Sequence, residues 1–431
     1  MVAFSLALAG PVPVPGLGTV TLPGSEQVRE LLGIADSSRC EAPEPAVPRG
    51  AVEVDTNLRP GVTFHVTDAR PISRCFDVRI DAVLPGDGVS PEALTDDGTL
   101  WRAPRQGDDV ARFLRRVNPL DDGATDLLAA PLVTPADRES TIGDVTTVES
   151  LTAHGNRAAW FEITRESTDP TPHRIVLAAG GTRSGAVTAD GYESRSITEI
   201  EGQYHYRLAV TAQRVAWRQE GAPSGSTSDL TTPEWLTMPA WVTSIDSGKP
   251  ESLGVHTTAI GADDDEIVVA TLDELAGRRS TTTFTSFGDN GRETTVLTLE
   301  HPHGTTVEFV DITDDVVTYA LLGGDVVVVP RVNGVADVEG GEAVAVRLAD
   351  GAMGDAMSTL SADGDTVAWV SGAVAYLLRD TATSRAASPD LVRIGQSGPR
   401  GHVMVGLAGD RIAWSTIKRS TVTINVGTLR E

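Results

Sequence analysis

The sequence predicts an all-β protein folded as a β-propeller, and two observations carry this prediction. A short phrase recurs along the chain, in which a tight turn leads into a strand ending in Ala-Trp, as in SADGDTVAWVS at 361–371 and AGDRIAWST at 408–416. Self-similarity at a period of tens of residues is the mark of a repeat architecture. The composition agrees, because 43 glycines, 25 prolines and no long helical periodicity are typical of short strands joined by turns.

Seven positions mark the repeat. The phrase returns in 155–162 and 212–219, 96–104 extends the series backward, and 263–270 and 313–320 carry valine and tyrosine in the tryptophan slot. Steps of 45 to 59 residues separate the seven slots, which are Trp101, Trp160, Trp217, Val269, Tyr319, Trp369 and Trp414. Seven such units predict about seven four-stranded blades, with six as the alternative count.

The phrase itself indicates a strand that is covered on both faces. Alternate side chains of a strand point to opposite sides, so Val367 and Trp369 share one face while Ala368 lies on the other. The large face fills the space beside one blade, and the small face lets the next blade approach closely. Asp-Gly or Gly-Asp before the strand favours a tight turn, since glycine tolerates positive φ and aspartate bonds to nearby backbone.

The residues after each phrase supply the remaining strands of a blade. Runs at 111–117, 241–246, 374–380 and 421–429 have the composition of strands, and several end in a further turn. The phrase SADGDTVAWVS resembles the TolB-type, WD-like β-propeller repeat, in which Ser-x-Asp-Gly leads into a strand ending in an aromatic residue. The resemblance covers roughly residues 90–431. It implies a periplasmic or secreted binding or scaffold module, or the propeller part of a larger peptidase.

The N-terminal region differs from the repeats, and we expect 1–50 to be a leader and linker before a propeller at 51–431. Met1–Ala9 is apolar and Ala7-Leu8-Ala9 resembles a signal-peptidase site, but a basic n-region is missing. The run is also shorter than the roughly 20 residues of a transmembrane helix. The chain therefore begins inside a longer signal peptide or with an exposed Pro-rich leader, and we expect a secreted or extracytoplasmic protein. Residues 25–35 are either a short helix or disordered.

Ring closure is expected to involve the segment 51–90. The last repeat ends close to Glu431 and lacks an outer strand, whereas the apolar runs 62–66 and 74–84 have no blade of their own. We expect one of these runs to pair with the final blade and to cover its edge.

The two cysteines, Cys40 and Cys75, lie outside the repeats. In an exported protein such a pair forms a disulfide that would tie the leader to the first strands, and the alternative is two unrelated thiols.

The search for catalytic and metal motifs is negative, and we assign no catalytic residue, metal ligand or cofactor. A sialidase Asp box fails because Asp363 and Gly364 are adjacent, and 395–399 misses a nucleophile elbow because Pro399 replaces the last glycine. His301 and His303 could ligate a metal, but Pro302 and Gly304 favour a hairpin loop. Likewise, 263–266 could hold calcium, although a solvated turn fits its acids better. Propeller-like sequence reaches the last residue, so we expect no appended hydrolase domain.

Charge narrows the class of partner. A formal net charge of −25 excludes a nucleic-acid partner, which needs clustered cations. We therefore expect a binding or scaffold propeller that recognises a protein or envelope component. The alternative is a propeller enzyme, a hydrolase or lyase, with its site at the central channel. Tyr204, His205 and Tyr206 could form an aromatic binding surface at a channel mouth or lie along an internal strand.

Overall fold

The protein is seen in a computed structural model, which describes most of the chain after residue 55. The described residues are 12–14, 18–20, 43–48, 56–58, 60–86, 92–95, 98–102, 113–119, 126–131, 144–155, 157–166, 172–182, 192–200, 204–219, 237–246, 249–273, 279–322, 325–338, 343–348, 357–372, 374–381, 389–396, 405–418 and 421–430. Within these ranges the only helical element is the 3₁₀ turn Val66–Asp68. No helix among them is long and apolar enough to cross a membrane.

The described strands form one small hairpin and six larger sheets. In the hairpin, β1 (Val12–Val14) pairs with β2 (Gly18–Val20). The larger sheets contain, in hydrogen-bonded order, β6 (Glu92–Leu94), β7 (Leu100–Arg102), β8 (Phe113–Val117) and β9 (Asp126–Pro131); β10 (Asp144–His154), β11 (Arg157–Glu166), β12 (Pro172–Thr182) and β13 (Tyr192–Glu199); β14 (Tyr204–Val210), β15 (Arg214–Gln219), β16 (Met238–Ser244), β17 (Glu251–Ala262), β18 (Glu266–Asp273), β19 (Arg279–Gly288) and β20 (Glu293–Pro302); β21 (Val307–Ile312), β22 (Val316–Leu321), β23 (Val326–Val332), β25 (Val344–Arg347) and β3 (Val62–His65), with β24 (Val335–Ala336) attached to β23; β26 (Met357–Asp363), β27 (Thr366–Ser371), β28 (Val374–Arg379), β29 (Asp390–Gln396) and β4 (Arg70–Pro71); and β30 (Val405–Ala408), β31 (Arg411–Lys418), β32 (Thr421–Leu429) and β5 (Val78–Gly86).

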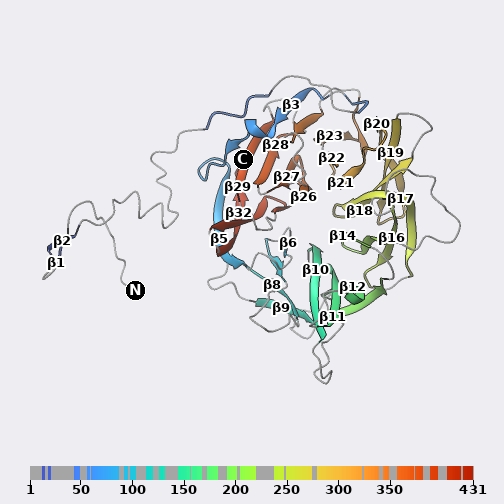
Figure 1. Cartoon of the computed structure of the whole chain (residues 1–431), viewed down its shortest axis with the longest axis horizontal. Helices are drawn as coiled ribbons and strands as arrows, with labels where there is room; N and C mark the ends of the chain where they lie inside the picture. The colour runs from blue at the N-terminus through green and yellow to red at the C-terminus, as the bar shows by residue number, and fades with distance from the viewer. Residues whose placement is uncertain are drawn as a thin grey trace.

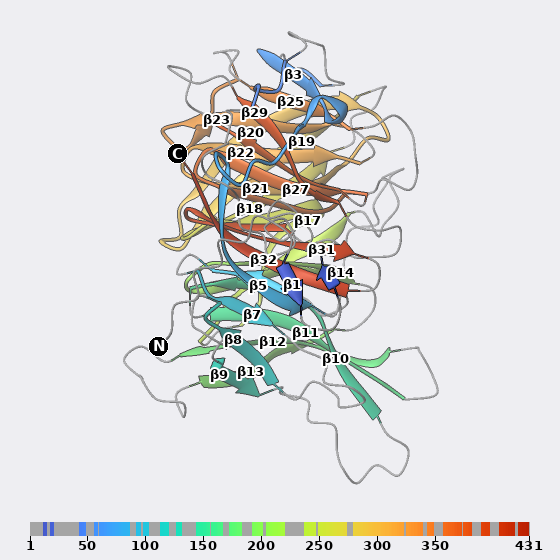
Figure 2. The same cartoon turned by 90° about the vertical axis from the view of Figure 1, so that its left-hand side faces the viewer.

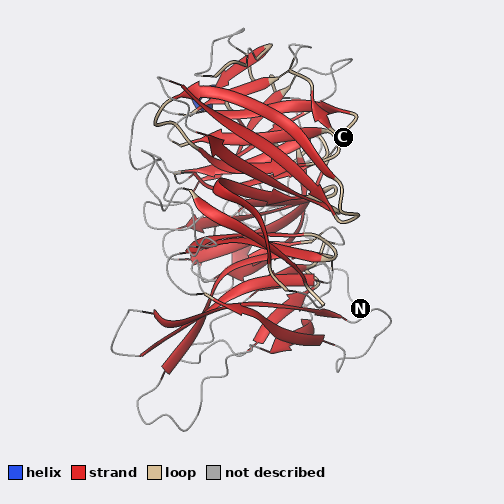
Figure 3. Cartoon of the chain, turned by 90° about the vertical axis from the view of Figure 1, so that its right-hand side faces the viewer, coloured by secondary structure: helices blue, strands red, loops and turns tan. Residues whose placement is uncertain are grey.

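These sheets stand around a common centre, and the chain passes once round the ring (Figure 1). Seven strands, which we call the inner strands, contact one another in a closed circuit that runs through β6, β10, β14, β17, β21, β26, β30 and back to β6. In a side view, nearly all of the described elements are strands (Figure 3). Antiparallel sheets arranged radially around a centre make a β-propeller.

Strand β17 belongs to two neighbouring groups of strands. Its first half, up to Thr257, pairs with β16, and its second half, from Thr257 to Ala262, pairs with β18. Beside the changeover, His256 has a positive φ of 52°. The buried Arg218 donates through Nη1 to the carbonyl oxygens of Thr257, at 2.9 Å, and Thr258. This guanidinium binds the backbone where the strand leaves one group and joins the next.

Each repeat residue lies on the second strand of its group and is buried, with at most 4% of its surface exposed. In six cases the side chain packs against the preceding group. Trp369, for example, contacts a cluster that includes Phe309, Val316 and Val328 of the sheet before it. The neighbouring Ala368 faces the following sheet, where Trp414 packs. Large side chains thus face backward and small ones forward around the ring.

Trp101 is the exception and corrects the repeat register. It packs with Trp160 of the following sheet, whereas Leu100 packs with Ala413 of the preceding one. The turn before β7 is one residue longer than its counterparts, because the N–H of Thr95 bonds to the carbonyl of Thr99 four positions on, at 3.0 Å. The step elsewhere is three residues, as from Thr211 to Arg214. A one-residue shift moves every side chain of a strand to the other face.

One end of the ring, which we call the turn face, carries the turns between first and second strands. In five groups the carbonyl four positions before the repeat residue accepts a bond from the end of the third strand or the turn after it. The bonds are Ile245 N to Gln213 O at 2.8 Å, Asp289 N to Asp265 O at 2.6 Å, Arg331 N to Asp315 O at 2.7 Å, Thr381 N to Asp365 O at 3.2 Å, and Leu429 N to Asp410 O at 2.7 Å. This repeated bond fixes the turns relative to their own sheets.

Residues 56–86, which we call the strap, run along the outer edges of successive sheets (Figure 2). Asn57 exchanges two hydrogen bonds with the backbone of Glu300 on β20. Next, β3 pairs in parallel with β25, and β4 pairs in parallel with β29. Finally, β5 pairs antiparallel with β32 and is the fourth strand of the last sheet. The strap therefore covers sheet edges that would otherwise be open.

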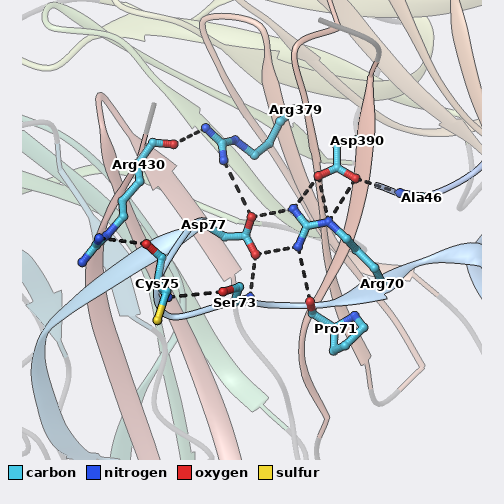
Figure 4. A network of polar contacts seen from close by, with 9 residues as sticks. All are labelled: Ala46, Arg70, Pro71, Ser73, Cys75, Asp77, Arg379, Asp390 and Arg430. Atoms are coloured by element: carbon cyan, nitrogen blue, oxygen red, sulfur yellow. Dashed lines mark hydrogen bonds and ion pairs between the residues drawn. The ribbon is translucent and has the colours of Figure 1, made fainter. Parts of the chain in front are cut away.

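A buried ionic cluster anchors the strap to the ring (Figure 4). Arg70 donates to both carboxylate oxygens of Asp77, at 2.5 and 2.7 Å, and to Asp390 on β29. Hydrogen bonds from Arg70 to Asp77, more than those to Asp390, raise the pKa of this arginine. Arg379 approaches Asp77 to 4.0 Å. Only 2% of the Asp77 side chain is exposed, and its buried carboxylate is paired with these two arginines and accepts from the N–H of Ser73 at 2.5 Å.

Two sequence expectations about the leader fall outside the described residues. Cys75 lies in the turn between β4 and β5, but Cys40 is not described, so the disulfide stays a prediction. The same holds for the helix at 25–35.

We expect Trp369→Ala to lower the free energy of unfolding by about 3–5 kcal/mol, because it leaves a cavity between two sheets. The control is Val83→Ala on β5, where 57% of the side chain is exposed and the change should stay within about 0.5 kcal/mol. Urea denaturation midpoints measure both. Similar losses in the two variants would contradict the role given to the repeat residue.

We expect Arg70→Ala to cost about 3–5 kcal/mol, because it leaves the buried carboxylate of Asp77 without its main partner. Arg79→Ala is the matched control, since its bond to Asp81 is made by a side chain that is 60% exposed and should cost about 0–1 kcal/mol. Calorimetric melting of both variants tests this. Equal melting temperatures would show that the cluster does not hold the strap.

Candidate functional site

Carboxylates from three consecutive inner strands gather near the turn face. Asp263 follows β17, Asp311 lies on β21 and Asp363 ends β26, and all three are partly buried. They are close enough for the charge of Asp363 to raise the pKa of Asp263, and for the charge of Asp263 to raise the pKa of Asp311. This group is the strongest candidate site in the described part of the ring.

Two of these carboxylates tie one inner strand to the next. Asp311 Oδ2 accepts from the N–H of Ala362 at 2.9 Å, and Asp363 Oδ2 accepts from the N–H of Gly409 at 2.5 Å. Ser361 Oγ accepts in the same manner from the N–H of Leu407 at 3.1 Å. Ala362 and Leu407 lie on β26 and β30, the edge strands of their described sheets, and Gly409 lies in the turn after β30. The side chains therefore satisfy backbone groups that would otherwise need water.

Repeat geometry explains why Asp311 makes a second bond. Gly261, Asp311 and Ser361 occupy the same position, eight residues before the repeat residue. At Gly261 a Cβ atom would lie 2.3 Å from the carbonyl oxygen of Val310, so the two backbones are in direct contact. Gly261 has no side chain that could accept a hydrogen bond from the N–H of Ile312 on the next inner strand. Asp311 Oδ1 accepts from this N–H instead, at 3.1 Å.

Burial shifts the titration of this group. Desolvation raises the pKa of Asp311 to about 7, against the opposing effect of the Ala362 and Ile312 hydrogen bonds and of Arg207. Desolvation also raises the pKa of Asp263 to about 7, with further contributions from the charges of Asp264, Asp363 and Asp314. Both carboxyls therefore change protonation near neutral pH.

A cation on the inner strand β14 packs on an aromatic ring of β21. The Arg207 guanidinium carbon on β14 lies 3.5 Å from the centroid of the Phe309 ring on β21. Burial raises the pKa of Glu308, and Arg207 and Arg218 act in the opposite direction. The acids of the inner strands are thus accompanied by the cation Arg207 on β14.

The turn face itself is acidic. Exposed aspartates stand in the turns of three groups, namely Asp264, Asp265, Asp314, Asp315 and Asp410. His154 Nδ1 lies 3.5 Å from Asp264 Oδ1, which links the end of β10 to the turn after β17. This charge distribution favours positively charged partners.

The two histidines considered as metal ligands are placed in different surroundings. His301 is fully buried in β20, with Nε2 2.8 Å from Thr282 Oγ1, and burial lowers its pKa. His303 is exposed in the turn that follows, with Gly304 at a φ of 83°. No group of three or more potential ligands occurs among the described residues, including the acids at 263–266.

The aromatic candidate 204–206 begins β14, an inner strand. Tyr204 packs on Phe161 with ring centroids 4.8 Å apart and donates to Glu149 at 3.3 Å. The side chains of His205 and Tyr206 lie outside the described set. Tyr204 thus packs between two sheets.

The sequence did not identify Asp311, Arg207 or Arg218, and it pointed to Asp363 only as part of a sialidase Asp box that fails. The only available signal was position: Asp311 and Ser361 are polar at one place in the repeat, and Asp263 and Asp363 share another. Their partners lie about one repeat away, so neither spacing nor motif could pair them.

No family model and no curated protein matches the chain. Several solved structures are similar at low identity. The N-terminal domain of Nup159 is 9% identical, with a TM-score of 0.43, covering 86% of this chain and 99% of that one. Human WBSCR16 is 11% identical, with a TM-score of 0.45, and the match covers 80% of this chain and 88% of that one. The β-propeller domain of the trilobed protease from Pyrococcus furiosus is 9% identical, with a TM-score of 0.36, and the match covers 68% of this chain and 82% of that one. TM-scores this low decide neither family nor function, and the fold assignment rests on strand order and the closed circuit of inner strands.

The raised pKa values predict a pH dependence of stability. An aspartate in the unfolded chain has a pKa of about 4. Between about pH 4 and 7 the folded protein therefore holds more protons at Asp263 and Asp311 than the unfolded chain, and their contribution to stability falls as the pH rises through this range. Asp263→Asn should flatten the dependence of the urea midpoint on pH, whereas Asp265→Asn, in the exposed turn, should leave it as in the wild type. Parallel profiles for all three proteins would refute the shift.

Proposed function

We propose that this chain is a β-propeller binding or scaffold module that recognises a protein or envelope component outside the cytoplasm. The observation that carries the proposal is the state of the central carboxylates. Asp311 and Asp363 accept hydrogen bonds from backbone N–H groups of the next group of strands, which gives them a structural role. Exposed aspartates stand instead in the turns of the turn face, where a partner can reach them.

The blade count in this proposal is seven. The closed circuit has seven inner strands, and each is followed by a strand that carries a repeat residue. The seven-stranded sheet then comprises two blades that share β17, the outer strand of one and the inner strand of the next. We retain the domain division at residue 50, with the strap as part of the propeller.

Location outside the cytoplasm is supported by the sequence of the leader. The apolar start, the Ala7-Leu8-Ala9 site and the resemblance of 361–371 to the TolB-type repeat favour export. A Cys40–Cys75 disulfide belongs to the same proposal and would be detected as a linked peptide by mass spectrometry without reduction.

The second candidate function is a propeller enzyme with acid–base chemistry at the centre. One observation favours it: Asp263 and Asp311 have pKa values of about 7, as a general acid working at neutral pH requires. Both would act on a substrate held against the inner strands.

Crosslinking in intact source cells, followed by co-purification, tests the binding proposal, and we expect a discrete partner from the cell envelope. A parallel panel of glycosidase, esterase and peptidase substrates should show no turnover. Turnover that survives repurification, is lost in Asp263→Asn and persists in the exposed control Asp265→Asn would replace the binding proposal with the enzyme.

A further inference from the structure

An apolar hairpin projects on the turn face beside the acidic turns. Strands β23 and β24 pair through Val332 and Val335, which are 55% and 43% exposed, and Val338, three residues after Val335, is 48% exposed. Asn333 and Gly334 connect the strands with φ values of 54° and 82°, as in the tightest hairpin turns. Exposed valines grouped on one hairpin are unusual unless something covers them.

A buried arginine holds this hairpin in place. Arg331 donates to Glu266 Oε1 of β18 at 2.6 Å, to the carbonyl of Gly334 at 3.2 Å, and to the carbonyl of Thr313. Only 4% of the Arg331 side chain is exposed. The hairpin is therefore bonded to its own sheet and to the preceding one, and a partner would not have to order it on binding.

Exposed acids flank the hairpin from both of these groups of strands. Asp265 stands next to Glu266 in the turn before β18, and Asp314 and Asp315 stand in the turn before β22. The N–H of Arg331 bonds to the carbonyl of Asp315 at 2.7 Å, which places the start of the hairpin against that turn. Apolar side chains bordered by acids are complementary to a segment that carries both apolar and basic residues.

We propose that Val332, Val335 and Val338, with Asp265, Asp314 and Asp315, form the docking surface for a basic amphipathic segment of another protein. The inference rests on the proposed binding function and specifies its surface. A second copy of this chain is a poorer occupant, because a net charge of −25 repels it.

The test uses the full chain and a labelled helical peptide of leucine and lysine, with its glutamate counterpart as the opposite-charge probe. Fluorescence anisotropy should show binding of the lysine peptide alone, weakening with salt. Val332→Ser/Val335→Ser should weaken binding about tenfold or more. Asp314→Asn/Asp315→Asn should weaken it and reduce its salt dependence. Val83→Ser/Leu322→Ser, which changes exposed apolar residues on β5 and at the opposite end of β22, should bind as the wild type does.

Four other outcomes would contradict the proposed docking surface or part of it. Failure of the wild type to bind the lysine peptide, or equal binding by all variants with unchanged urea midpoints, overturns the inference. Equal binding of the glutamate peptide removes the role of charge. A crosslinked envelope partner captured equally by wild type and both variants would leave the proposed function standing and move the binding surface elsewhere on the ring.

Discussion

Contact of one large side chain per group with the preceding sheet is the interaction on which the ring depends. A sheet that faces neighbours on both sides cannot expose a polar face, so both faces of the second strand must be apolar and complementary. Trp369 and Ala368 show how the chain meets this constraint: the indole covers the sheet behind, and the alanine makes room for Trp414 of the sheet ahead. Because the ring closes, the last alanine, Ala413, meets Leu100 of the first group.

A second constraint comes from the inner strands, because those such as β26 and β30 are edge strands of their described sheets. Backbone N–H groups on the open edge of such a strand need hydrogen-bond acceptors that no neighbouring strand supplies. The chain resolves it with side chains from the preceding strand, as Asp311 does for Ala362 and Ser361 does for Leu407. A carboxylate placed there is desolvated by its surroundings, which raises the pKa of Asp311. A raised pKa in this ring can therefore arise from assembly alone, without catalysis as its cause.

The repeat could be predicted from the sequence because its pattern lies within a few consecutive residues. The features that the sequence did not predict depend on single residues or on contacts between residues far apart in the chain. One extra residue in the turn before β7 turned Trp101 to the other face, a shift that composition does not reveal. The double role of β17 depends on His256 and on the buried Arg218 from another strand. Asp311 and its partner Ala362 are 51 residues apart, so only the assembled ring pairs them.

The turn face combines these two constraints. The turns are held by hydrogen bonds between backbone atoms, which do not depend on the side chain at each position. Their carboxylates can therefore be replaced without loss of the fold. At the junction of β18 and β23, by contrast, Arg331 and Glu266 are fixed by burial and by their bond to each other. The buried ion pair of Arg331 and Glu266 therefore maintains the structure of this surface. The exposed acids and valines beside it are the residues that a partner can contact.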